Sequence, residues 1–149
     1  MSEIYEGGCL CGAVRYRVTG APVAAYVCHC SYCQRSSGAA FQMPVFFKAR
    51  HVEFSGAEMH TFDYVSPTHG RTIQTQFCPT CGTRIGSRIS RVPGVQIISA
   101  GTMDQRHTVA VTCHLFTESK VPWVRLPLET PCYAQHFVSE SGEPQQAIE

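Results

Sequence analysis

The sequence lacks long hydrophobic runs. No window approaches the about eighteen consecutive apolar residues that a membrane-spanning helix needs. The first residues, Met-Ser-Glu-Ile-Tyr-Glu, are acidic and lack the apolar centre of a secretory signal. We therefore expect a cytoplasmic protein with no membrane partner.

Blocks of charge are also lacking. Twelve Lys and Arg residues balance eleven Asp and Glu residues, so the formal net charge is +1, and neither sign is clustered. Proteins that bind nucleic acid through phosphate contacts usually carry a basic patch or stripe. The charge pattern therefore favours a protein without a nucleic-acid partner.

The size and composition predict one folded domain. The chain has 149 residues, of which 44% are hydrophobic and 15% are charged, which is typical of a globular domain and not of a disordered chain. Only residues 139–149 are biased, toward Ser, Glu, Gln, Gly and Pro. We predict a single β domain over residues 1–138 and a mobile tail over residues 139–149.

Long amphipathic helices are missing as well, and the apolar residues mostly recur with a period of two. Val14, Tyr16 and Val18, for example, alternate with Arg15 and Arg17, as on a half-buried strand. We predict a mainly β fold of short antiparallel strands with very little helix. The expected strands include 14–18, 39–47, 51–54, 59–65, 72–77, 95–100 and 111–116. The only expected helical turns are Ser31–Ser37, after an N-capping serine, and Thr102–Gln105.

Cysteine, by contrast, is abundant, with nine residues. An odd number, and the scarcity of structural disulfides in a reducing compartment, argue against a disulfide framework. Seven of the nine fall in three tight groups, and thiolate groups at such spacings bind metal ions. The groups are Cys9 and Cys11; Cys28, Cys30 and Cys33; and Cys78 and Cys81.

The run Cys78-Pro-Thr-Cys81-Gly82 is the most specific of these signals. In such a knuckle, the backbone turns so that amide N–H groups point at the sulfurs, and Gly82 permits the turn. A closed structural zinc site has four ligands, and one knuckle supplies two. Cys9 and Cys11 are the best complement, which predicts a four-thiolate zinc site that staples a small β domain.

Cys28, Cys30 and Cys33 occupy six consecutive residues and lack a fourth cysteine nearby. Three protein ligands and an open position are typical of a catalytic zinc ion. The sequence therefore predicts a second zinc ion, with two zinc ions per chain. Three alternatives stay open: closure by Cys113 or Cys132, closure by His29 or His114, and a redox or free-thiol cluster in place of the second zinc site.

Five runs in this order resemble the motifs of the glutathione-dependent formaldehyde-activating (GFA) family, which is also known from centromere protein V. The runs are Gly7–Tyr16, Cys28–Phe41, Phe77–Thr83, Ala100–Asp104 and His114–Trp123. The resemblance implies a small, zinc-stapled β-tent. It also implies that Cys9, Cys11, Cys78 and Cys81 hold a structural zinc ion and that Cys28, Cys30 and Cys33 hold a catalytic one.

The family's namesake reaction joins formaldehyde to glutathione and gives S-(hydroxymethyl)glutathione, a carbon-sulfur lyase reaction. The resemblance thus implies a zinc enzyme whose partners are a small thiol, such as glutathione, and an aldehyde. We assign Cys30, His29 and Arg35 as catalytic residues. Position 34 departs from the pattern, because Gln34 stands where many members carry a second basic residue beside Arg35. Other candidate donors to the developing oxygen are Ser36, His114 and Lys120.

Two further readings of the same residues remain. One is a related lyase or hydrolase that acts on a different thiol adduct. The other is a non-catalytic glutathione or aldehyde carrier, or a zinc-stapled binding module. A second site closed by a fourth protein ligand favours the module, whereas an exchangeable fourth position favours an enzyme. The edge strands of a small open sheet are compatible with either a monomer or a homodimer.

Overall fold

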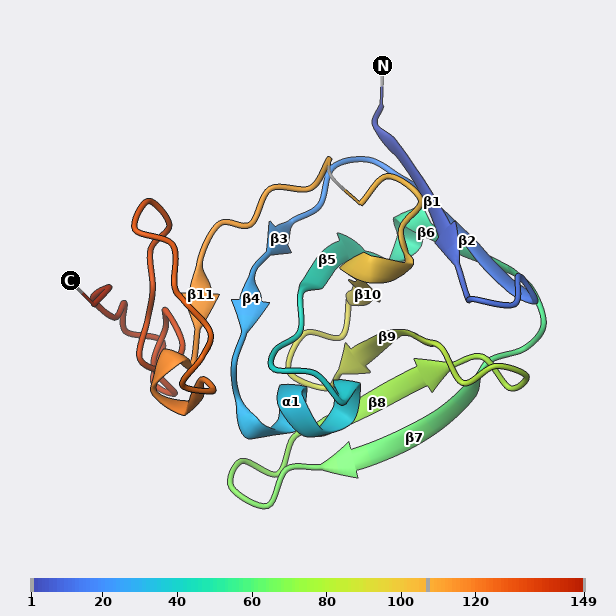
Figure 1. Cartoon of the computed structure of the whole chain (residues 1–149). Helices are drawn as coiled ribbons and strands as arrows, with labels where there is room; N and C mark the ends of the chain where they lie inside the picture. Colours follow the sequence, from blue (N-terminus) through green and yellow to red (C-terminus); the bar gives the residue numbers. More distant parts are fainter. Residues whose placement is uncertain (1, 107, 149) are drawn as a thin grey trace. The chain divides into compact units, whose positions relative to one another are not determined.

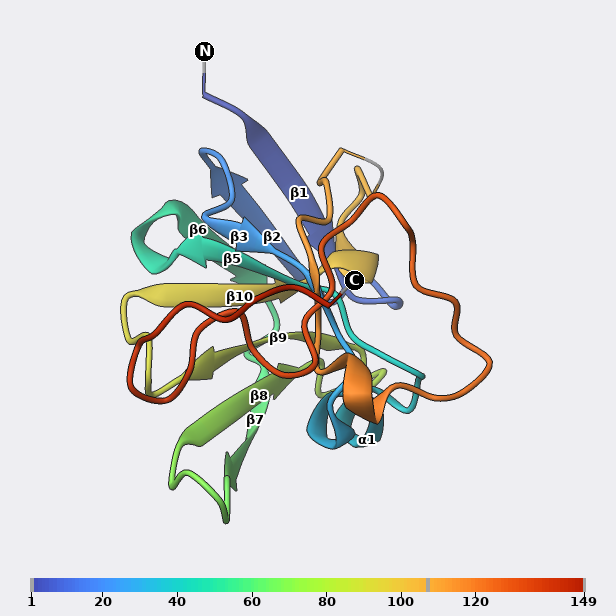
Figure 2. The same ribbon diagram turned by 90° about the vertical axis from the view of Figure 1, so that its left-hand side faces the viewer.

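The computed structural model describes residues 2–106 and 108–148 and is mainly β with very little helix, which confirms the predicted fold class (Figures 1 and 2). The strands are β1 (Ile4–Gly8), β2 (Val14–Thr19), β3 (Ala24–Ala25), β4 (Val27–Cys28), β5 (Pro44–Lys48), β6 (Val52–Gly56), β7 (His60–Val65), β8 (Thr72–Phe77), β9 (Arg84–Ile89), β10 (Val95–Ser99) and β11 (His114–Leu115). The helices are α1 (Ser31–Ser37) and the 3-10 turns η1 (Ala49–His51), η2 (Ala100–Thr102) and η3 (Thr117–Ser119). None of the helices in the described part of the chain has the length and apolar character of a membrane span.

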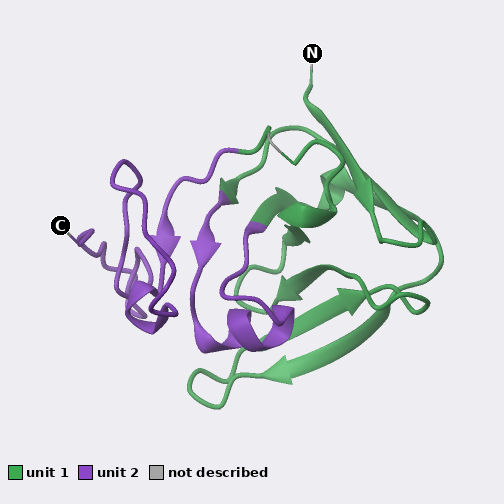
Figure 3. Ribbon diagram, in the orientation of Figure 1, with its two compact units in different colours: residues 1–24, 45–109 green, residues 25–44, 110–149 purple. Residues whose placement is uncertain are grey.

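The chain divides into two compact units, each built from two stretches of sequence (Figure 3). Unit 1 contains Met1–Ala24 and Val45–Val109, and unit 2 contains Ala25–Pro44 and Ala110–Glu149. The division into one domain and a mobile tail stays a prediction. Within that tail, Ser139 N donates to Glu143 O, and Pro144 pairs with Val138, the last residue of the predicted domain, in an isolated bridge. Glu149 lies outside the described residues.

The smaller sheet of unit 1 has the order β1-β2-β6, and both of its strand pairs are antiparallel. The predicted alternation of β2 is confirmed, because Val14, Tyr16 and Val18 are all buried. β1 and β2 form a hairpin in which Gly8 pairs with Arg15. The turn of this hairpin therefore carries the first cysteine pair.

The larger sheet has the order β3-β5-β10-β9-β8-β7. β8 and β9 are antiparallel neighbours, and Figure 1 shows them joined by a turn between Phe77 and Arg84. This turn carries the Cys78 knuckle. Ile85 and Ile98, from β9 and β10, are completely buried and belong to the core that fixes this end of the sheet.

Unit 2 contains a two-stranded sheet, β4 and β11, that is parallel rather than antiparallel. Cys28 also pairs with Gln42, and His114 with Cys132, in isolated bridges. A parallel pair needs a long crossover, and here most of unit 1 lies between the two strands in the sequence. The sequence pattern carries no signal for such a distant pairing.

Helix α1 has the predicted bounds, Ser31–Ser37, but its predicted serine cap is wrong. The N-cap is Cys30, whose Sγ accepts a hydrogen bond of 3.3 Å from the N–H of Cys33. The helix ends at Gly38, which adopts a left-handed conformation with φ of 71°. One of the candidate metal ligands thus also starts the helix.

Two expected strands are shorter than predicted. The segment 39–47 is extended only from Pro44, and the segment 111–116 only at His114 and Leu115. Their outer residues make isolated contacts instead, such as Thr112 N to Ala25 O. The turn expected at Thr102–Gln105 is the 3-10 turn η2, two residues earlier.

Candidate metal centres

The first candidate centre lies in unit 1 and brings together all four cysteines expected to form the structural site. The Sγ atoms of Cys9, Cys11, Cys78 and Cys81 all lie within 4.8 Å of one another. The Cys9–Cys11 distance is 3.6 Å, and the Cys11–Cys78 distance is 3.7 Å. The β1–β2 and β8–β9 turns supply two cysteines each, so residues 67 positions apart meet at one point.

These distances fit a tetrahedral metal site. Zinc bonds thiolate sulfur at about 2.3 Å, so adjacent sulfurs in a regular tetrahedron are about 3.8 Å apart. The two measured separations, 3.6 and 3.7 Å, are close to this edge. The four sulfurs can therefore hold a metal ion of zinc's size and preference.

The four cysteines of this centre are named cluster 1. Polar groups around cluster 1 point at its sulfurs. Val14 N donates to Cys9 Sγ at 3.2 Å, and Thr80 N donates to Cys78 Sγ at 3.4 Å. Gly82 has φ of 73°, so the turn that follows Cys81 adopts the left-handed conformation that glycine permits. Such N–H donors stabilise thiolate charge and orient the ligands.

Thr83 is a residue of cluster 1 that the sequence analysis missed. Its Oγ1 accepts from the N–H of Leu10 at 3.1 Å and lies 3.1 Å from Cys81 Sγ. Because the amide can only donate, the hydroxyl hydrogen is free to be donated to the sulfur. Thr83 thus connects the turn of one hairpin with a sulfur of the other.

The thiols of Cys81 and Cys11 in cluster 1 have unequal acidities. The hydroxyl and the N–H of Thr83 lower the pKa of Cys81 to about 5. The N–H of Ala13 favours the Cys11 thiolate, but the sulfurs around it, Cys9 first, raise its pKa to about 11. Neighbouring negative charges oppose one another. A full set of thiolates at this spacing therefore calls for a cation.

The second candidate centre, cluster 2, lies in unit 2 and consists of Cys28, Cys30 and Cys33. Their Sγ atoms also lie within 4.8 Å of one another. Cys28 ends β4, Cys30 caps α1, and Cys33 lies in the first turn of that helix. Cys28 and Cys33 are buried, and Cys30 is partly exposed. Cluster 2 is thus a local construction of one strand end and one helix start.

The acidities within cluster 2 diverge more strongly. Hydrogen bonds from Cys28 and then Cys33 lower the pKa of Cys30 to about 3. The same contact with Cys30 raises the pKa of Cys28 to about 12, and Cys28 and Cys30 raise that of Cys33. One sulfur thus accepts negative charge readily, and the other two do so only with a compensating cation.

A pair of histidines lies beside cluster 2. His29 lies between Cys28 and Cys30 in the sequence, and its side chain is completely buried. Its Nε2 is 2.9 Å from Nδ1 of His114. Burial lowers the pKa of both imidazoles, and the charges of His114 and Lys120 lower that of His29 further. Within the described residues, His29 Nδ1 is a buried polar atom without a hydrogen-bond partner.

Gln34 holds α1 in place. Its Nε2 donates to His29 O at 2.7 Å and to Ser119 O at 2.9 Å. Gln34 therefore ties the helix to the backbone of cluster 2 and to η3. It does so at the position where the resemblance leads us to expect a second basic residue. Gln42 adds a second brace, because its Nε2 donates to Cys33 O at 3.1 Å.

The other residues weighed from the sequence are placed differently. Arg35 is exposed on α1, so the protein does not bury its charge against cluster 2. Cys113 and Cys132 are buried in unit 2. Within the described residues, no further Cys, His, Asp or Glu ligand atom lies within 4.8 Å of all three sulfurs of cluster 2.

Comparisons with known proteins find one family and one fold that this chain resembles. A family model described as "Glutathione-dependent formaldehyde-activating enzyme" matches residues 4–119. A protein of Halomonas elongata named "Putative glutathione-dependent formaldehyde-activating enzyme" is 31% identical over 130 residues, which cover 83% of this chain and 81% of that protein. A crystal structure of a Rhodobacter sphaeroides protein, 19% identical, superposes with a TM-score of 0.52 over 67% of this chain and 88% of that one. The last likeness concerns the fold alone.

Proposed function

The chain belongs to the glutathione-dependent formaldehyde-activating family, and from this membership we propose that it is a zinc-dependent carbon-sulfur lyase. The reaction joins formaldehyde to a low-molecular-weight thiol, glutathione, and gives S-(hydroxymethyl)glutathione. The observation that carries the proposal is the composition of cluster 2, three sulfurs within 4.8 Å of one another and no fourth protein ligand atom at that distance within the described residues.

The two clusters have different proposed tasks and take one zinc ion each. Cys9, Cys11, Cys78 and Cys81 hold a structural ion, because four sulfurs complete a tetrahedron. Cys28, Cys30 and Cys33 hold the catalytic ion, for which three ligands leave one position to a substrate. Bound there, zinc supplies a positive charge that favours the thiolate form of a substrate thiol.

The protein's own groups act on the rest of the reaction. The thiol gives up its proton, the thiolate sulfur attacks the carbonyl carbon of formaldehyde, and the C=O electron pair moves to the oxygen. That oxygen then takes up one proton, which balances the one lost by the thiol, and becomes the hydroxyl of the product. This oxygen needs a hydrogen-bond partner as its charge develops. His29 Nδ1, buried and without a partner in the described structure, is the proposed one.

His114 is proposed to position His29. The 2.9 Å contact between His29 Nε2 and His114 Nδ1 fixes the plane of the His29 ring, and Gln34 fixes the backbone oxygen of the same residue. With its backbone and one ring nitrogen held in this way, His29 keeps its other ring nitrogen in one place.

Arg35 and Lys120 are proposed to contact the charged ends of the thiol substrate rather than the reacting atoms. The side chain of Arg35 is exposed, and the charge of Lys120 is close enough to His29 to lower the pKa of its imidazole. Position 34 adds no positive charge to the site because glutamine is neutral, and its amide braces α1 instead. The cytoplasm is the proposed compartment, since its reducing conditions keep thiolate ligands available to a metal.

The experiment is an NMR exchange measurement with the zinc-loaded protein. Formaldehyde and glutathione react without a catalyst, so the rate of exchange with S-(hydroxymethyl)glutathione is measured with and without protein and the difference taken. We expect faster exchange with the native chain and with Cys113→Ser, a buried cysteine outside both clusters. Cys30→Ser is expected to remove the acceleration.

The other outcomes separate the remaining functions. If the native protein holds two zinc ions but leaves the exchange rate unchanged, the formaldehyde reaction is wrong. Acceleration with another thiol or another aldehyde then indicates a related lyase. Saturable binding of glutathione without acceleration indicates a carrier.

A further inference from the structure

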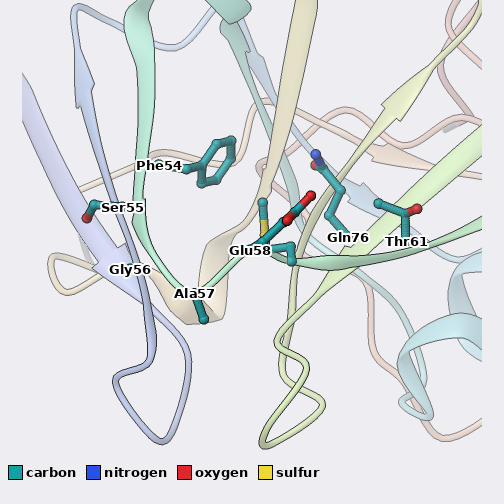
Figure 4. Close-up of a pocket in the computed structure, with 8 residues that line it drawn as sticks. Phe54, Ser55, Gly56, Ala57, Glu58, Thr61 and Gln76 are labelled. Carbon is teal, nitrogen blue, oxygen red and sulfur yellow. The ribbon is translucent and has the colours of Figure 1, made fainter.

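An open surface cavity of about 290 Å³ lies in unit 1, between β6, β7 and β8 and the link from β6 to β7 (Figure 4). Its lining contains none of the cysteines of either cluster. The side chains on its lining include those of Phe54, Glu58, Met59, Thr61 and Gln76. Phe54 and Met59 are apolar, and the other three are polar, so the cavity offers both kinds of contact.

A chain of buried amides leads to this cavity. The Nε of Arg88 donates to Gln96 Oε1 at 3.0 Å, and Gln96 Nε2 donates to Gln76 Oε1 at 2.7 Å. Gln96 Nε2 also lies within hydrogen-bond distance of the backbone oxygens of Ser87 and Ile97. Gln96 is completely buried and Gln76 is 8% exposed. Burying two amides is costly unless their polar atoms are paired.

The direction of this chain is fixed by its ends. A guanidinium only donates hydrogen bonds, so it must meet the oxygen of Gln96. Backbone carbonyls only accept, so they must meet the nitrogen of Gln96. That nitrogen can then pair only with the oxygen of Gln76. The oxygen of Gln76 is thus committed to Gln96, and the N–H groups of its Nε2 are the polar groups that this cavity-lining side chain has left for a ligand.

The position of Arg88 strengthens these donors. Each hydrogen bond in a chain polarises the next, and the charge of Arg88 lies at the donor end. At the cavity, the result is a buried donor with a preference for an oxygen acceptor. Glu58, an exposed carboxylate on the lining, provides the opposite preference because it accepts from N–H groups and repels anions.

We propose that this cavity binds small neutral carboxamides. The carbonyl oxygen of such a ligand accepts from Gln76, its N–H donates to Glu58, and its apolar part packs against Phe54 and Met59. A carboxylate lacks the N–H and is repelled by Glu58, whereas an amine lacks the acceptor for Gln76. The cavity volume suits a ligand of benzamide's size. The site is independent of the proposed lyase reaction.

The test is a titration of the full, zinc-loaded chain with benzamide, followed by two-dimensional 15N–1H NMR of backbone and side-chain amides. We expect the Gln76 side-chain amide to shift with saturation at about millimolar concentration, the range for a fragment of this size. Benzoate and benzylamine are the probes that lack one half of the amide, and each is expected to bind at least about tenfold more weakly.

Variants separate binding from folding. Gln76→Ala is expected to abolish saturable benzamide binding, and it leaves Gln96 Nε2 with two backbone acceptors, so the fold is retained. Gln74→Ala, the same change on the same strand but outside the lining, is the matched control and is expected to bind as the native chain does. Glu58→Gln, at an exposed position, is expected to reduce the preference for benzamide over benzoate.

Three results overturn the proposal. The first is the absence of a saturable shift at the cavity residues with up to about 20 mM benzamide, a concentration well above that range. The second is equal affinity for benzamide and benzoate in the native chain. The third is unchanged benzamide binding by Gln76→Ala that is correctly folded by its backbone spectrum.

Discussion

Clusters 1 and 2 are built from the same side chain in opposite ways. Cluster 1 joins two hairpin turns that are far apart in the sequence, and four sulfurs lie within 4.8 Å of one another. Cluster 2 takes three sulfurs from six consecutive residues, at the start of a short helix. Metal binding at cluster 1 therefore closes a long loop, whereas metal binding at cluster 2 constrains only a local segment. The difference predicts that loss of cluster 1 affects the fold and that loss of cluster 2 affects chemistry.

The largest expected effect is that of Cys78→Ser. Structural zinc sites contribute about 10–16 kcal/mol of apparent binding free energy, which is more than the usual stability of a domain. We expect insoluble protein or the loss of a cooperative unfolding transition by circular dichroism. A soluble variant with a cooperative transition like that of the native chain would show that cluster 1 is not a staple.

Cys30→Ser is expected to keep the fold and lose one zinc ion and the catalysed exchange. Serine is a good helix N-cap, so α1 is preserved in this variant. Cys30→Ala removes the cap as well and is expected to cost a further about 1 kcal/mol of unfolding free energy. Zinc content and thermal unfolding of the two variants check this, and global unfolding of Cys30→Ser would contradict the local role of cluster 2.

Thr83→Val is expected to weaken metal binding at cluster 1 by about 10–100-fold, the range for losing a hydrogen bond to a metal ligand. The variant loses the hydroxyl between Leu10 N and Cys81 Sγ but keeps its shape. Thr83→Ser keeps the hydroxyl and is expected to behave as the native chain does. Competition with a chelator, monitored by zinc release, measures the effect, and an equal loss in both variants would assign it to packing.

His114→Leu is expected to reduce the catalysed exchange by about tenfold or more with unchanged zinc content, because His29 loses the partner that orients it. His114→Asn retains a polar group close to the position of Nδ1 and is expected to restore part of the rate. Loss of zinc from either variant would instead make His114 part of the metal site.

The smallest effect is expected for Asp104→Asn, near the β1–β2 hairpin. Asp104 pairs with Arg15, but both side chains are almost half exposed, so the pair contributes at most about 1 kcal/mol. The Arg15 guanidinium lowers the pKa of Asp104, so this contribution is present above the ordinary aspartate pKa and is lost as the pH falls below it. Thermal unfolding of the variant and of the native chain at neutral pH, where the thiolate sites keep their metal, measures it. A loss as large as that of Cys78→Ser would show that ion pairing, and not sulfur, holds this hairpin.

The sequence predicts the local features of both clusters well. The spacing of Cys28, Cys30 and Cys33 and the bounds of α1 follow from neighbouring residues, and the Gly82 turn follows from the absence of a Cβ. The pairing of Cys9 and Cys11 with the Cys78 knuckle required only the count of four ligands. These features depend on short segments and on elementary coordination chemistry.

Other features depend on contacts that no local pattern contains. His29 and His114 are 85 residues apart, and their contact accompanies the parallel pairing of β4 with β11. The N-cap of α1 is Cys30, and the known preference for serine at N-caps led the prediction to a serine instead. The bridging role of Thr83 also depends on a distant contact, because Thr83 lies two residues after Cys81 but its second partner, Leu10, is 73 residues away in the sequence.

The most direct test of the difference between the clusters is a cobalt titration of the metal-free chain, with near-ultraviolet thiolate-to-metal absorption as the readout. We predict two cobalt ions per chain and, on addition of glutathione, a further thiolate band in the native protein that Cys30→Ser does not show. A spectrum that glutathione leaves unchanged, with two cobalt ions bound, would mean that cluster 2 is closed by the protein and would contradict the account.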